Sequence, residues 1–217
     1  MRIFQKAALV SLLAVPGWSS IVLYNNLNGP FPFQGTSVTV QSNVGIAVNF
    51  MPSATGTVAN VNLPMLNDTP APIQGIVSIY SDKSGTPGAL LETLADTPVL
   101  STTTATLETA DATAPVTLNS GVPYWLVVFT TGTSPAHAQW FDNDAGVASA
   151  FDILVGSSKS FSVFESVAAG AEVSPAFEIN GSPVMAVVPE PGYGAVSLLG
   201  LAAVVIVARL RKKSTQT

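Results

Sequence analysis

The chain has 217 residues, of which 47% are hydrophobic and only 10% are charged, against about 25% charged residues in ordinary soluble domains. This composition excludes a coiled coil, a charge-rich disordered chain and a basic nucleic-acid binder. The absence of cysteine excludes disulfides, thiolate metal sites and thiol catalysis. The length has room for one domain with a hydrophobic core, plus short terminal appendages.

The charges are distributed unevenly along the chain. Six of the eight basic residues lie close to the two termini, and between residues 20 and 188 only Lys83 and Lys159 remain beside twelve acidic residues. The middle of the chain therefore carries a net charge of −10. A surface of this sign repels phosphate backbones, so we expect no nucleic-acid partner.

The first 19 residues are typical of an export signal. Two basic residues precede an apolar run over Ala7–Val15, and the small residues Gly17 and Ser19 follow it. This pattern predicts a secretory signal peptide over residues 1–19, helical through Val15 and removed by signal peptidase. The apolar run is too short for a comfortable membrane span.

The segment from 20 to 187 alternates short apolar runs with clusters of turn residues. This pattern predicts strands at 44–50, 58–63, 76–80, 104–109, 124–129, 138–141, 151–155, 161–164 and 177–180. Residues 90–94 fit either a short strand or one helical turn. We therefore predict an all-β fold, an antiparallel β-sandwich of jelly-roll type. Its inward faces should hold the side chains of Val48, Phe50, Val77, Ile79, Leu126 and Val128.

Two segments of this middle resemble a known family. The first runs Ile79-Tyr80-Ser81-Asp82 and then Gly85-Thr86-Pro87-Gly88 and Leu91, and the second runs Asn119-Ser120-Gly121 into Tyr124-Trp125-Leu126-Val127. Together they resemble the choice-of-anchor domain of the R type, over roughly residues 22 to 180. The resemblance implies a β-sandwich ectodomain and brings no catalytic residue with it.

The sequence offers little material for catalysis. His137 is the only histidine, and no serine lies in a Gly-x-Ser-x-Gly turn. The acidic residues lie mostly in turns, where a solvated carboxylate is the ordinary state. We therefore predict that the protein is not an enzyme and has no resident cofactor.

One cluster in the middle indicates a ligand. Trp140 could stack on a sugar ring, and Asp142, Asn143 and Asp144 could offer oxygen atoms to Ca²⁺. The spacing departs from the calcium-loop pattern, because the third oxygen ligand before the glycine and the distal glutamate are absent. The alternative interpretation is an Asx-rich turn after a strand whose Trp140 fills the core.

A second apolar stretch lies near the C-terminus. Residues 192–208 contain no charge, and Arg209, Arg211, Lys212 and Lys213 follow at once. Seventeen apolar residues are at the short end of what crosses a bilayer, and the basic cluster stays on the cytoplasmic side. The pattern predicts a single transmembrane helix over Gly192–Arg209, with the C-terminus in the cytoplasm and the bulk of the chain exported.

Immediately before this stretch stands Val188-Pro189-Glu190-Pro191, which should be extended and exposed because proline forbids regular helix. Over 188–213 the chain has this motif, then the apolar stretch, then the basic tail. This order resembles the PEP-CTERM sorting signal. The resemblance implies export by a Gram-negative bacterium that makes exopolysaccharide. It also implies docking in the inner membrane and processing by an exosortase, an intramembrane cysteine protease.

The expected product is a non-catalytic protein of the cell surface or extracellular matrix with a structural or adhesive role. The alternative hypothesis is a carbohydrate-binding module, assisted by Ca²⁺, that acts on the surface or in exopolysaccharide. Neutral glycans suit an acidic domain better than polyanions do.

Overall fold

The computed structural model describes residues 19–27, 36–132, 137–142, 149–167 and 173–184. Within these ranges the chain is all-β, with thirteen strands and no helix. The strands are β1 (Ile21–Asn25), β2 (Ser37–Gln41), β3 (Val44–Phe50), β4 (Gly56–Asn67), β5 (Gly75–Asp82), β6 (Pro87–Thr93), β7 (Thr106–Asp111), β8 (Thr117–Leu118), β9 (Tyr124–Thr130), β10 (His137–Phe141), β11 (Phe151–Ser157), β12 (Ser160–Val167) and β13 (Glu178–Pro183).

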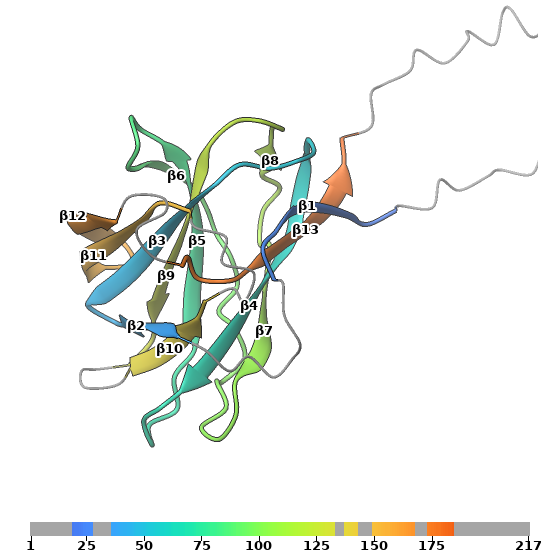
Figure 1. Ribbon diagram of the computed structural model, residues 1–217. Coiled ribbons are helices and arrows are strands. Elements are labelled where there is room, and N and C mark those ends of the chain that lie inside the picture. The colour runs from blue at the N-terminus through green and yellow to red at the C-terminus, as the bar shows by residue number, and fades with distance from the viewer. Residues whose placement is uncertain (1–18, 28–35, 133–136, 143–148, 168–172, 185–217) are drawn as a thin grey trace, which may run out of the picture. The chain divides into compact units, whose positions relative to one another are not determined.

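The strands form two antiparallel sheets (Figure 1). Sheet A has the order β1-β13-β4-β10-β2, and β7 and β8 also pair with β4. Sheet B has the order β12-β11-β3-β9-β5-β6. Neighbouring strands are often distant in the sequence, so most of the pairing is long-range.

The predicted strand segments are confirmed, with bounds that shift by a few residues. The ambiguous segment at 90–94 belongs to a strand, β6. Three strands were not predicted: β1, β2 and the two-residue β8. The predicted helices at the two termini and the extended segment at 187–191 lie outside the described residues. In the part of the chain that the structure describes, no helix is long and apolar enough to cross a membrane.

The two sheets share one hydrophobic core. Sheet A contributes Leu23, Val61 and Leu63 among others, and sheet B contributes alternate residues of β3, β5 and β9. All six side chains predicted to face inward belong to this core and are at most 2% exposed. Burying each of them contributes about 1.5 to 3 kcal/mol.

Sheet B also buries its other face. Side chains that point away from the shared core form a second cluster, which we call the outer cluster: Ala47, Tyr80, Trp125, Val127, Phe129 and Leu154. Phe161 of β12 packs on it, with its ring centroid 5.4 Å from that of Tyr80 and 5.9 Å from that of Phe129. All seven residues of β9 are consequently buried.

The outer face of sheet A carries a set of polar side chains that bond to one another. Glu178 accepts hydrogen bonds from the side-chain amides of Asn25, Asn62 and Asn180 at 2.8, 3.2 and 2.7 Å. The chain of bonds continues from Asn180 to Asn60, at 3.2 Å. We call this set the amide network. It joins β1, β13 and β4 through side chains as well as through the backbone.

Candidate ligand-binding surface

Strand β10 contains the tryptophan of the predicted ligand cluster, and it points inward. Trp140 is completely buried, and its Nε1 donates a hydrogen bond to the carbonyl of Ala176 at 2.8 Å. Its ring lies 6.1 Å from that of Phe177, centroid to centroid. The indole therefore offers no face to a sugar ring. The prediction of a stacking platform at Trp140 is wrong, and the alternative, that Trp140 fills the core, is confirmed.

The residues beside Trp140 point the other way, because side chains alternate along a strand. His137, Gln139 and Phe141 of β10 lie opposite Gln41, Thr39 and Ser37 of β2 in the antiparallel register. We call these six residues the β2–β10 face. Four of them carry hydroxyl or amide groups, one carries an imidazole and one an aromatic ring.

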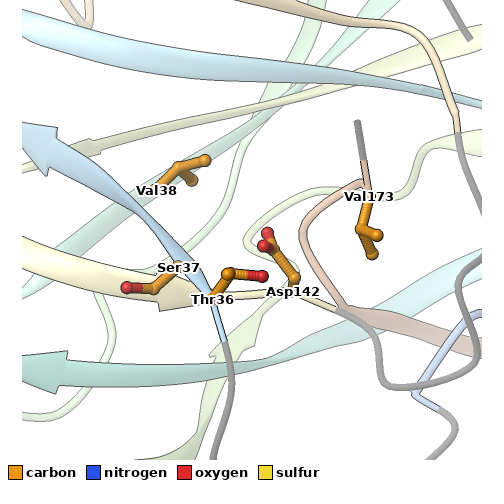
Figure 2. A pocket seen from close by; sticks show the side chains of 5 residues that line it. All are labelled: Thr36, Ser37, Val38, Asp142 and Val173. Atoms are coloured by element: carbon orange, nitrogen blue, oxygen red, sulfur yellow. The ribbon is translucent and has the colours of Figure 1, made fainter. Parts of the chain in front are cut away.

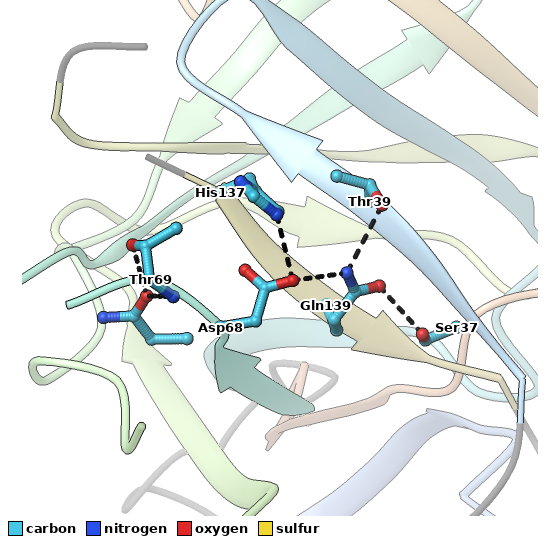
Figure 3. A network of polar contacts seen from close by, with 7 residues as sticks. Ser37, Thr39, Asp68, Thr69, His137 and Gln139 are labelled. Carbon is cyan, nitrogen blue, oxygen red and sulfur yellow. Dashed lines mark hydrogen bonds and ion pairs between the residues drawn. The ribbon is translucent and has the colours of Figure 1, made fainter. Parts of the chain in front are cut away.

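Hydrogen bonds order this face (Figure 3). The Ser37 hydroxyl donates to the Gln139 side-chain oxygen at 2.8 Å. The Gln139 amide nitrogen donates to the Asp68 carboxylate at 2.8 Å and lies 3.4 Å from the Thr39 hydroxyl. The Gln139 amide is thereby fixed in one orientation, which presents defined donors and acceptors at the surface.

Asp68 links the face to the segment after β4. Its Oδ2 lies 3.0 Å from His137 Nε2, and both side chains are about one-third exposed, at 28% and 34%. The neighbouring turn is held by Asn67, whose Oδ1 accepts from the backbone nitrogen and the hydroxyl of Thr69 at 2.9 and 2.8 Å. Sequence reasoning missed Asp68, because 69 positions separate it from His137.

A cavity of about 430 Å³ lies at the end of the β2–β10 face. Its lining consists of Thr36, Ser37, Val38, Asp142 and Val173 (Figure 2). The backbone positions Asp142, whose nitrogen donates to the Thr36 carbonyl at 3.0 Å and which forms an isolated bridge with Pro175. The size falls in the range that accommodates a small ligand.

The other members of the predicted calcium cluster, Asn143 and Asp144, lie outside the described residues. Among the residues that the structure does describe, no group of three or more His, Asp or Glu side chains could hold a metal ion. Calcium binding at Asp142, Asn143 and Asp144 therefore stays a prediction.

The sorting motif at 188–191 and the basic residues at 209–213 likewise lie outside the described ranges. The structure thus brings a polar face and a cavity together around strand β10. The sequence predicted that strand but neither the face nor the cavity.

When the chain is compared with protein-family models, curated proteins and solved structures, it matches none of them.

Proposed function

We propose that this is an exported protein of the cell surface or extracellular matrix, sorted through a C-terminal signal that an exosortase processes. The observation that carries the proposal is the order of three features: Pro189-Glu190-Pro191, an uncharged stretch at 192–208, and a basic cluster at 209–213. Each feature alone is weak. Their succession, combined with the signal-peptide pattern at 1–19, supports export followed by transient anchoring in the inner membrane.

In this proposal the β domain has a structural or adhesive role and performs no catalysis. It would be a jelly-roll-like sandwich held outside the cell. Two observations support the role: the domain is built on core packing without cysteine, and the described outer face of sheet A carries amides and hydroxyls bonded to one another.

Intact-mass measurement of the mature protein tests the processing step. The full-length chain is expressed in a Gram-negative host with and without an exosortase, beside a variant carrying Pro189→Ala and Glu190→Ala. We expect loss of the residues after the motif only for the unaltered chain in the host with exosortase. An intact tail on all mature copies in that host would contradict processing and leave a permanently anchored single-pass protein.

Carbohydrate binding is a second candidate function, favoured by the β2–β10 face. Gln139, Thr39 and Ser37 present amide and hydroxyl groups in fixed positions beside the partly buried ring of Phe141. Sugar sites combine such polar groups with an aromatic surface. The candidate thus rests on the neighbours of Trp140 instead of on Trp140 itself.

A glycan array with and without calcium tests this candidate. The full-length chain, held in detergent, is compared with Gln139→Ala and with the matched control Asn180→Ala in the amide network. We expect the Gln139 variant alone to lose binding to neutral glycans. Absence of binding by the unaltered chain in both conditions would leave the structural role.

A further inference from the structure

Strand β12 forms one edge of sheet B, beside β11 (Figure 1). Within the described residues it pairs with β11 alone, and six of its eight residues are exposed. The exposed side chains include two large apolar ones, Val163 at 38% and Phe164 at 73% exposed. Such an edge presents unpaired backbone groups next to apolar surface, so it is a template for a further strand.

The backbone of β12 points alternate residues toward that free edge. The Gly156 nitrogen of β11 donates to the Asn43 carbonyl, on the side away from β12, at 3.1 Å. Gly156 and its partner Phe161 therefore form a non-hydrogen-bonded pair, in which the Phe161 N–H and C=O point away from β11. Val163, two residues further on, points its backbone groups the same way. Phe161 and Val163 thus offer the donors and acceptors for another strand.

The regular part of the free edge ends at a bulge. The register between β11 and β12 shifts between Ile153 and Leu154, which makes Phe164 an extra residue on β12. Ser160 to Val163 precede the bulge in regular antiparallel register. This segment holds no lysine or proline, which are residues that commonly block strand edges.

The opposite edge strand of sheet B is less suited to pairing. Strand β6 begins with Pro87 and Gly88, and its register with β5 shifts twice within seven residues. Proline removes a hydrogen-bond donor, and each irregularity interrupts the row of backbone groups that a further strand needs. We therefore place the docking edge at β12.

The charges around β12 favour a second copy of the chain as the partner. Between residues 20 and 188 the net charge is −10, so two copies repel each other over most of their surface. Residues 153–167 carry one lysine, Lys159, and one acid, Glu165, and are neutral overall. Lys159 lies three positions before Ser162, and Glu165 lies three positions after it. In an antiparallel pair centred on Ser162, Lys159 of each copy therefore lies near Glu165 of the other.

We propose that two copies of this protein associate through β12, in an antiparallel pair with its twofold axis at Ser162. Phe161 of each copy then forms backbone hydrogen bonds with Val163 of the other. Both side chains lie on the outer face of sheet B, so Phe161 of one copy packs beside Val163 of the other. Because both copies use the same edge, the contact closes at a dimer. The proposal concerns the folded domain alone and does not depend on export or processing.

Cysteine crosslinking tests the pairing and its register, because the chain has no cysteine of its own. In the proposed pair the two Ser162 Cα atoms are about 4.5 Å apart, a distance that a disulfide can bridge. The two Ser160 Cα atoms are more than about 13 Å apart, because four residues separate these positions along the paired strands. The full-length chain in detergent is oxidised with copper phenanthroline as Ser162→Cys and, as the matched control, as Ser160→Cys.

We expect a covalent dimer of Ser162→Cys, whereas Ser160→Cys should form none under the same conditions. Both positions are exposed, so neither change disturbs the core. A Ser162→Cys variant that forms no covalent dimer, or equal crosslinking of the two variants, would overturn the proposed pair.

Sedimentation velocity of the full-length chain in detergent, without oxidant, measures the association itself. Val163→Lys places a charge on the free edge and should abolish the dimer. Lys159→Glu should weaken the dimer at least threefold, and adding Glu165→Lys should restore it, because opposite charges again lie side by side.

Three results of the sedimentation experiment would each overturn the proposal. The first is an unaltered chain that is monomeric up to its solubility limit. The second is a dimer that survives Val163→Lys, which would place the contact elsewhere. The third is an exchange of Lys159 and Glu165 that fails to restore association.

Discussion

The outer faces of the two sheets differ in polarity and in burial. Sheet A presents the amide network, in which Asn62, Asn180 and Glu178 bond to one another at the surface. Sheet B buries the outer cluster beneath Phe161 of its own edge strand, β12. One sheet therefore has one buried face and the other has two, which explains why β9 is apolar at nearly every position while β4 alternates with asparagine.

The two outer faces are expected to contribute differently to stability. Removing apolar volume from the outer cluster should strongly affect folding, because buried rings are tightly packed on both sides. Changes in the amide network should affect folding little, because exposed hydrogen bonds exchange readily with water. Four variants test this division, from the largest expected effect to the smallest.

Phe129→Ala should cause the largest loss. The Phe129 ring is 1% exposed in the outer cluster, and such truncations typically lower the free energy of unfolding by about 3 to 5 kcal/mol. Urea denaturation measures the change. Phe164→Ala is the matched control, because Phe164 is 73% exposed and its loss should change stability by no more than about 0.5 kcal/mol. Similar losses for both would mean that the outer cluster is not packed as described.

Gly45→Ala should lower stability by about 1 to 3 kcal/mol, because a Cβ there would lie 2.5 Å from the Phe129 ring. The three atoms nearest to that Cβ all belong to the Phe129 ring. Combining Gly45→Ala with Phe129→Ala should therefore lower stability by less than the sum of the two separate losses. A double-mutant cycle by urea denaturation measures this coupling. Strict additivity would show that the alanine is tolerated by movements elsewhere.

Asp152→Asn tests the acid that lies on the outer face of sheet B, opposite Ala47. Burial raises the pKa of the Asp152 carboxyl, and a hydrogen bond from Ser166 lowers it by less. The folded state therefore holds the proton more tightly than the unfolded chain does. The contribution of the Asp152 carboxyl to stability is present below the pKa that this group has in the unfolded chain. It is lost as the pH rises through the higher pKa of the folded protein.

The asparagine variant carries no such penalty, so its stability relative to the unaltered chain should be higher at pH 7 than at pH 3. Urea denaturation at the two pH values makes the comparison. A difference between the two proteins that does not change with pH would contradict the burial of an ionisable Asp152.

Asn180→Ala should have the smallest effect, a loss of about 0.5 to 1.5 kcal/mol. It removes hydrogen bonds to Asn60 and Glu178 at a surface where water can replace them. Thermal unfolding of this variant beside Phe129→Ala compares the two outer faces directly. A loss as large as that of Phe129→Ala would reverse the proposed division between the sheets.

Periodicity sufficed for the core because alternation fixes which residues share a face. A period of two places Val48 on the same face as Phe50, and Leu126 on the same face as Val128. Periodicity cannot say which of two apolar faces is inside, and in β9 both are buried. The same ambiguity explains the error at Trp140, whose buried ring belongs to the shared core and lies beside that of Phe177.

The candidate site depends on contacts that no local pattern encodes. Gln139 and Asp68 meet across 71 positions, and Gln139 and Ser37 across 102. Strand β2 was not predicted, although it is as long as the predicted β10 and its inward residues Val38 and Val40 alternate as a strand requires. The predicted strand at 58–63 ends four residues before the observed end of β4 at Asn67, so the prediction did not place Asp68 at the end of a strand.

Protease accessibility on intact cells tests most directly whether the β domain is displayed outside. The full-length chain and a variant lacking residues 1–19 are expressed in a Gram-negative host carrying an exosortase, and the cells are treated with proteinase before and after lysis. We predict that the domain of the full-length chain is degraded on intact cells, whereas the variant is degraded only after lysis. Protection of the full-length chain on intact cells, with degradation only after lysis, would contradict export to the surface.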